Sequence, residues 1–167
     1  MSRTRLANLA DAAAIAEIYN QGIEDRMATF EVHPRSVDDI ASALRTRLTS
    51  HPAVVVEEDA RVVAFAWASP YSSRPCYSGI AEHSVYVARA ARSSGHGKVA
   101  LLALIDEYEQ RGFWKLESRI FPENEASRQL HHSLGFREVG IHHRHARLDG
   151  AWRDTVIVER LLGEAKG

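Results

Sequence analysis

Apolar positions along the chain switch repeatedly between the spacing of an α-helix and that of a β-strand. Helical spacing follows Asp11 and Ser36 and returns over residues 98–108 and 124–134. The β-rich runs cover residues 4–7, 53–57, 62–68, 84–87, 114–121, 137–148 and 152–161. Strands and helices in this order predict one α/β domain over residues 1–167, with helices flanking a mixed central sheet.

Capping and turn residues mark the ends of these elements. Asp11 occupies an N-cap position, and Ser36 with Asp39 three residues later has the spacing of a capping box. Asp149-Gly150 is a strong signal for a tight turn between two antiparallel strands. The segment 69–79 is rich in proline, serine and glycine, which predicts a long loop with a functional role.

Composition narrows the class of protein. The chain has 167 residues, with 21 Lys and Arg against 22 Asp and Glu, so its formal net charge is −1. This balance argues against nucleic acid or an anionic membrane as a partner. Cys76 is the only cysteine, and no apolar run approaches the ~20 residues of a membrane span. We therefore expect a cytoplasmic protein.

The segment 92–98 has the features of an anion-binding site. It joins the strand Val85-Tyr86-Val87 to a helix, and its two glycines let the backbone approach a phosphate closely. The first N–H groups of a helix have no partner within the helix, and the helix dipole adds partial positive charge. Arg92 and Lys98 add local charge. Alternatively, the segment is an ordinary helix start with two incidental glycines.

The same segment resembles a signature of the GNAT superfamily of N-acetyltransferases. Arg92-x-x-Gly95-x-Gly97 is similar to the motif that cradles the coenzyme A pyrophosphate, and Asn124-x-x-Ser127-x-x-x-His131-x-x-x-Gly135-Phe136 is similar to the next signature element. The resemblance implies a mostly antiparallel sheet with a V-shaped opening for acetyl-CoA as co-substrate. The cofactor-binding residues that it implies are Val85, Tyr86, Val87, Arg92, Ser93, Ser94, Gly95, His96, Gly97, Lys98, Asn124 and Ser127.

A narrower resemblance is to the phosphinothricin N-acetyltransferase branch. It rests on Tyr19-Asn20, Thr29-Phe30-Glu31, Glu82-His83-Ser84-Val85-Tyr86-Val87 and Gly150-Ala151-Trp152-Arg153-Asp154. The branch acetylates the α-amino group of small glutamate-like amino acids: phosphinothricin, methionine sulfoximine, methionine sulfone and, in some members, arsinothricin. Its members are typically homodimers. The chain departs from the branch pattern in two places. The departure at 76–80 bears on which substrate side chain is accepted, and the one at 88–91 lies outside the cofactor contacts.

The branch resemblance implies two catalytic residues. Glu82 stands where the branch has its general base, which removes the proton that keeps an ammonium ion from attacking a thioester. The alternative for Glu82 is a solvated residue at a strand end. His131 stands where many members have a tyrosine near the coenzyme A sulfur, and there it protonates or hydrogen-bonds the departing thiolate.

Further residues are candidates for binding the substrate. Arg74 is a candidate clamp for a carboxylate or phosphinate, with Ser73 beside it and Phe30 as a wall of the pocket. The alternatives are a surface arginine and a core aromatic. The chemistry needs no metal, so we interpret His142, His143 and His145 as rim or dimer-surface residues.

Two other functions stay open. The first is acetylation of a protein N-terminus or lysine, although the long loop 69–79 favours a closed pocket over the open groove that a peptide needs. The second is a non-catalytic sensor of acyl-CoA, against which the presence of both Glu82 and His131 argues.

Overall fold

The computed structural model describes all residues, 1–167, and places every strand in one open sheet of order β1-β2-β3-β4-β5-β7-β6. The strands are β1 (Ser2–Leu6), β2 (Val54–Glu58), β3 (Arg61–Pro70), β4 (Ile80–Val87), β5 (Lys115–Ile120), β6 (Arg137–Leu148) and β7 (Ala151–Leu161). The helices are α1 (Ala12–Asp25), α2 (Val37–Arg47), α3 (His96–Gln110) and α4 (Glu125–Ser133). The predicted α/β fold is confirmed. No helix combines the length and apolarity needed to cross a membrane.

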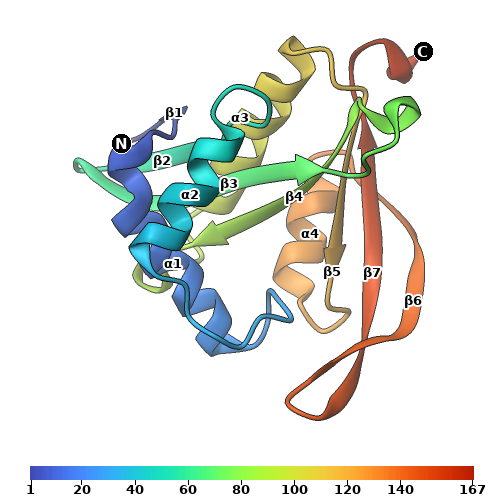
Figure 1. Cartoon of the computed structure of the whole chain (residues 1–167). Helices are drawn as coiled ribbons and strands as arrows, with labels where there is room; N and C mark the ends of the chain where they lie inside the picture. The colour runs from blue at the N-terminus through green and yellow to red at the C-terminus, as the bar shows by residue number, and fades with distance from the viewer.

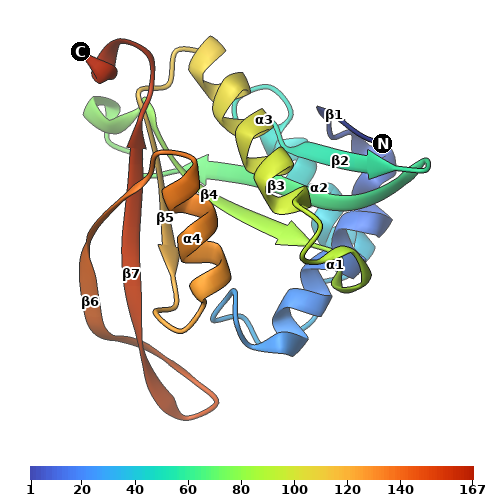
Figure 2. The ribbon, with the colours of Figure 1, turned by 180° about the vertical axis from the view of Figure 1, so that it is seen from behind.

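The helices cover the sheet from both sides (Figures 1 and 2). Helices α1 and α2 pack on one face, over an aromatic cluster in which Phe65, Trp67 and Tyr86 come from the sheet and Tyr19 from α1. Helix α3 packs on the opposite face through Leu101, Leu104 and other apolar residues, and Leu130 of α4 packs against the same core. Each helix thus buries one apolar stripe against the alternating side chains of the strands.

The structure contains the predicted capping box and hairpin turn, but not the predicted helix cap at Asp11. Ser36 and Asp39 form the predicted capping box, and the turn Asp149-Gly150 has positive φ at both residues, as a tight hairpin requires. Asp11 directly precedes α1, but its side chain does not cap that helix. Arg5 binds the Asp11 carboxylate through two bonds of 2.8 Å instead. A bidentate ion pair with Arg5, six residues earlier on β1, takes the place of the helix cap.

Strands β4 and β5 run parallel for only a short distance and then separate. Their register joins Ile80–Glu82 to Lys115–Glu117 and ends there. Just beyond the last pair, the Ser118 hydroxyl donates to the carbonyl oxygen of His83 at 2.8 Å. The other edge of β4 is paired with β3 from Ala81 to Val87. The β4 edge from Ser84 onward therefore faces an opening, which is the predicted V shape.

Candidate active site

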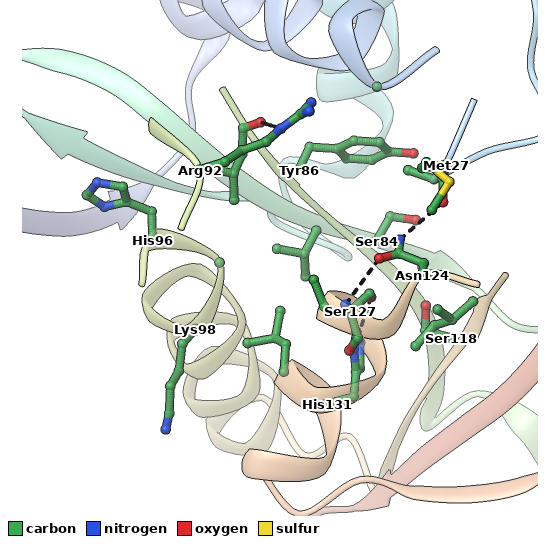
Figure 3. A pocket seen from close by; sticks show the side chains of 18 of the residues that line it. Met27, Ser84, Tyr86, Arg92, His96, Lys98, Ser118, Asn124, Ser127 and His131 are labelled. Carbon is green, nitrogen blue, oxygen red and sulfur yellow. Dashed lines mark hydrogen bonds between the residues drawn. The ribbon is translucent and has the colours of Figure 1, made fainter. Parts of the chain in front are cut away.

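A cavity of about 460 Å³ occupies the opening between β4 and β5, a size typical of small-molecule sites. Its walls come from both strands, from the ends of α1 and α3, and from α4 (Figure 3). The predicted site residues that line it are Val85, Tyr86, Val87, Arg92, Ser93, Gly95, His96, Gly97, Lys98, Asn124, Ser127 and His131. Segments 85–98 and 124–131, far apart in sequence, thus meet in one site.

The N-terminus of α3 opens onto this cavity. Gly95 is the N-cap, with a φ of 84° that favours glycine, and it has space around it. The first amide bonded within the helix is that of Val99, which donates to the Gly95 carbonyl oxygen at 3.2 Å. The amides of His96, Gly97 and Lys98 are thus free to donate to an anion. This geometry fits the phosphates of coenzyme A.

An aspartate holds Arg92 at the edge of the cavity. Arg92 Nη1 lies 2.6 Å from Asp25 Oδ2, and Arg89 Nη2 lies 2.9 Å from the other carboxylate oxygen. The guanidinium groups of Arg89 and Arg92 lower the pKa of Asp25, so this carboxylate stays charged. Lys98 also borders the cavity, but Figure 3 shows its side chain pointing away from the other labelled residues. Arg92 is thus the better placed of the two cations.

Asn124 ties two walls of the cavity together. Its side-chain oxygen accepts from the Ser127 amide at 3.2 Å, which caps α4. Its side-chain amide donates to the carbonyl oxygen of Met27 at 3.1 Å, in the loop after α1 (Figure 3). Asn124 therefore has a structural role in addition to the predicted cofactor contact.

His131 forms the inner wall of the cavity, and a second histidine binds it. The Nε2 atoms of His131 and His83 are 3.0 Å apart, and His131 Nδ1 lies 2.7 Å from the Ser127 carbonyl oxygen. A carbonyl oxygen only accepts, so His131 Nδ1 carries the proton. Burial lowers the pKa of both rings, and the neighbouring His131 lowers that of His83 further. In the neutral pair His83 donates through Nε2, so both ring nitrogens of His131 are engaged.

Acidification should destabilise the fold through this pair. The folded-state pKa of each ring lies below the ordinary value of 6.5, so the unfolded chain takes up protons first as the pH falls. The contribution of the pair to stability is full above pH 6.5 and declines below it. Its slope is at most about 1.4 kcal/mol per pH unit for each ring. Urea unfolding of the wild type and of His83→Leu over a series of pH values measures this slope.

The His83→Leu protein should show a shallower decline in its free energy of unfolding than the wild type, since it lacks one of the two rings. The matched control is His132→Gln, which removes an exposed imidazole next to His131 and leaves both rings of the pair in place. A slope in His83→Leu equal to that of the wild type would show that His83 is not held neutral.

Glu82 is the last residue of β4 to pair with β5. Its Oε1 accepts from Arg119 Nη1 at 3.1 Å, and its side chain is 36% exposed. It shares a face of β4 with Ser84, because side chains alternate along a strand. Ser84 and Arg119 line the cavity, whereas Glu82 itself does not. Glu82 is thus a solvent-accessible carboxylate two residues from Ser84, which lines the cavity.

The other predicted site residues lie outside the cavity lining. Phe30 packs edge-on against Phe121, a lining residue, with ring centroids 5.0 Å apart. Ser73 and Arg74 are exposed, and the Arg74 guanidinium lies 5.8 Å from the centre of the Tyr77 ring. Ser94 is exposed and does not contribute to the lining. Roles for these residues stay predictions.

Several lining residues were not expected from the sequence, namely Asp25, Met27, Ser84, Ser118 and Arg119. Ser84 lies within the motif Glu82-His83-Ser84-Val85-Tyr86-Val87. Arg119 could have been found from the alternation along β5, where Lys115, Glu117 and Arg119 form one charged face of the strand. Asp25 and Met27 carry no such signal, since only the tertiary fold brings the end of α1 to this opening.

Of the three histidines of β6, His143 and His145 are exposed and His142 is half-buried. The rings of His142 and His145 lie 4.5 Å apart, and His143 Nδ1 lies 3.3 Å from Asp154 Oδ2. Side chains that could hold a metal ion gather in groups of three or more nowhere in the structure.

Comparison with known proteins agrees with this geometry. The model of the acetyltransferase (GNAT) family matches residues 15–136. L-methionine sulfoximine/L-methionine sulfone acetyltransferase of Salmonella typhimurium is 33% identical over 161 residues, covering 96% of this chain and 94% of the relative. Phosphinothricin N-acetyltransferase of Streptomyces coelicolor is 29% identical over 160 residues, covering 91% of each chain.

A solved structure with the same fold holds acetyl-CoA. It is a GNAT superfamily phosphinothricin acetyltransferase from Sinorhizobium meliloti in complex with acetyl-CoA. It superposes with a TM-score of 0.92 at 32% identity, covering 98% of this chain and 89% of the other. The chain therefore belongs to the acetyltransferase (GNAT) family.

Proposed function

We propose that this enzyme transfers the acetyl group of acetyl-CoA to the α-amino group of a small amino acid. The candidate substrates are methionine sulfoximine, methionine sulfone and phosphinothricin, which the names of its relatives specify, and the analogue arsinothricin. One observation supports the proposal most strongly: three features border the same opening. They are the anion-binding N-terminus of α3, the unpaired edge of β4 and the accessible carboxylate of Glu82.

The proposed position of acetyl-CoA follows from the hydrogen-bonding groups around the cavity. Its pyrophosphate lies against the amides at the start of α3, with Arg92 beside it. Its pantetheine arm extends along the open edge of β4 at Val85 to Val87, where unpaired backbone groups accept and donate as in a sheet. Bound acetyl-CoA supplies the thioester that the amine attacks.

Glu82 is the proposed general base. It takes one proton from the substrate ammonium group, directly or through a water, so that the nitrogen has a free electron pair. The amine nitrogen then bonds to the thioester carbon, the C–S bond breaks, and coenzyme A leaves as the thiolate. The second proton of the nitrogen passes to solvent or to the thiolate, which leaves a neutral amide.

His131 is the proposed donor to that thiolate. Because both of its ring nitrogens are engaged, its Nδ1–H reaches the sulfur only after releasing the Ser127 carbonyl oxygen. The Ser127 hydroxyl, 3.5 Å from Nδ1, lies beside that path. That the enzyme forms a homodimer and that it works in the cytoplasm both stay predictions.

An acetyl-transfer assay tests this function. Release of the coenzyme A thiol is followed with phosphinothricin, methionine sulfoximine, methionine sulfone, arsinothricin, ordinary amino acids and a short peptide. We expect turnover with at least one of the glutamate-like amino acids and none with the peptide. Turnover with the peptide alone would favour protein acetylation, and tight acetyl-CoA binding without turnover would favour a sensor.

A further inference from the structure

A guanidinium group bridges two carboxylates where β4 and β5 separate. Glu82 and Glu117 are register partners, the last pair before the opening. Arg119 is two residues beyond Glu117 and therefore lies on the same face of the sheet. Its Nη1 donates to Glu82 Oε1 at 3.1 Å, and its Nη2 lies 3.9 Å from Glu117 Oε1. We call these three residues the acidic trio.

The acidic trio reaches the cavity from β5, through Arg119, whereas the proposed phosphate site lies at the start of α3. Arg119 lines the cavity together with Ser118 and Phe121. Of the other lining cations, Arg92 lies in the loop before α3 and Lys98 in the first turn of that helix. Arg119 is thus the lining cation that remains for an anionic group other than the phosphates.

The acidic trio is short of positive charge, with one guanidinium between two carboxyl groups. Glu117 has a side chain only 13% exposed, and burial together with the nearby Glu82 raises its pKa even though Arg119 opposes the shift. An added cation would relieve the repulsion between Glu82 and Glu117. An ammonium group is such a cation.

We infer that the Glu82–Arg119 ion pair recognises the zwitterionic head of a free α-amino acid, with the ammonium group on Glu82 and the carboxylate on Arg119. This inference rests on the proposed function and names its substrate class. The two charged groups of an α-amino acid sit on one carbon, so they are spaced like the partners of an ion pair. Inserted here, each meets a partner of opposite charge, and the guanidinium fork binds the carboxylate through two parallel bonds.

This assignment leaves Arg74 for a different group of the substrate. Arg74 lies in an exposed loop and does not line the cavity, whereas Arg119 contacts the proposed base directly. A substrate with an α-carboxylate and a second acidic group needs two cations. The α-carboxylate, which lies beside the reacting amine, requires the cation nearest Glu82.

A pair of substrates separates carboxylate binding from every other effect of Arg119. One is an amino acid that the wild type acetylates, for example L-methionine sulfone, and the other is the amine left when its carboxyl group is removed. In the wild type, the amino acid should have the higher kcat/KM. Arg119→Gln should lower kcat/KM for the amino acid roughly 10- to 100-fold, the loss expected for a charged hydrogen bond. The loss should appear mainly in KM.

With the amine lacking a carboxylate, the loss in Arg119→Gln should be clearly smaller than with the amino acid, because only the contact of Arg119 with Glu82 is then removed. Arg119→Lys, which keeps the charge without the fork, should recover part of the loss. Arg111→Gln, at the far end of α3 and paired with Glu107, is the matched control and should match the wild type with both substrates. Calorimetry measures the acetyl-CoA affinity of every variant, so that a loss of co-substrate binding is separated from a loss of carboxylate binding.

Equal losses with both substrates would overturn the inference, because Arg119 would then act only through Glu82. Unchanged kinetics in Arg119→Gln would overturn it as well, with the proposed function intact. A higher kcat/KM of the wild type for the amine without a carboxylate than for the amino acid would also overturn the inference. If the wild type acetylates no α-amino acid, the proposed function itself fails.

Discussion

Gly97→Asp should lower the affinity for acetyl-CoA roughly 10²–10³-fold, as expected for like charges ~4 Å apart near a protein surface. Gly97 lies in the first turn of α3, between Val87 and Leu130, each of which would lie 3.4 Å from an added Cβ. Its backbone is outside the left-handed region, so a side chain is accepted without strain. Isothermal titration calorimetry of the folded variant measures the affinity.

Two matched variants isolate the charge. Gly97→Asn has the same shape without the charge, and Gly97→Ala adds only the Cβ, so both should bind acetyl-CoA more tightly than Gly97→Asp. If Asp and Asn weaken binding equally, the effect is steric and the phosphates do not lie against these amides. Wild-type affinity in Gly97→Asp would move the phosphate site elsewhere.

Glu82→Gln should lower kcat roughly 10²–10⁴-fold, the range expected when a general base is removed. Glutamine keeps the shape of the side chain and an oxygen that accepts from Arg119, but it takes up no proton. Acetyl-CoA affinity should stay unchanged, because Glu82 does not line the cavity. Steady-state kinetics with a saturating amino acid, together with calorimetry for acetyl-CoA, measures both quantities.

The control for this variant is Glu107→Gln on α3, which removes a carboxylate of similar type far from the opening. It should keep the kcat of the wild type. Near-normal kcat in Glu82→Gln would remove Glu82 from the role of base, and a fall in kcat accompanied by lost acetyl-CoA binding would point to a disrupted site.

Much of the fold could be predicted because its signals are local. The capping box at Ser36 and the turn at Asp149-Gly150 depend on residues next to one another in sequence, and both formed as expected. Asp11 failed as a helix cap because its competitor, Arg5, reaches it from β1. Local propensity predicts such a cap, and a tertiary contact overrides it.

The candidate site also has a part that local sequence predicts and a part that depends on the tertiary fold. The phosphate end could be predicted, since the residues from Arg92 to Lys98 are contiguous and the strand before them is apolar. The contact of His83 with His131 joins residues 48 apart, and the Glu82–Arg119 bond joins residues 37 apart. Both depend on where β4, β5 and α4 meet, which no single segment encodes.

The most direct test of the proposed function identifies the product. The purified protein is incubated with acetyl-CoA and L-methionine sulfoximine, and the amino acid is then analysed by mass spectrometry and by NMR of its α-nitrogen. We expect one acetyl group on that nitrogen for each coenzyme A thiol released. Recovery of the unmodified amino acid, and of each related amino acid in the panel, from a protein that binds acetyl-CoA would contradict the proposed function.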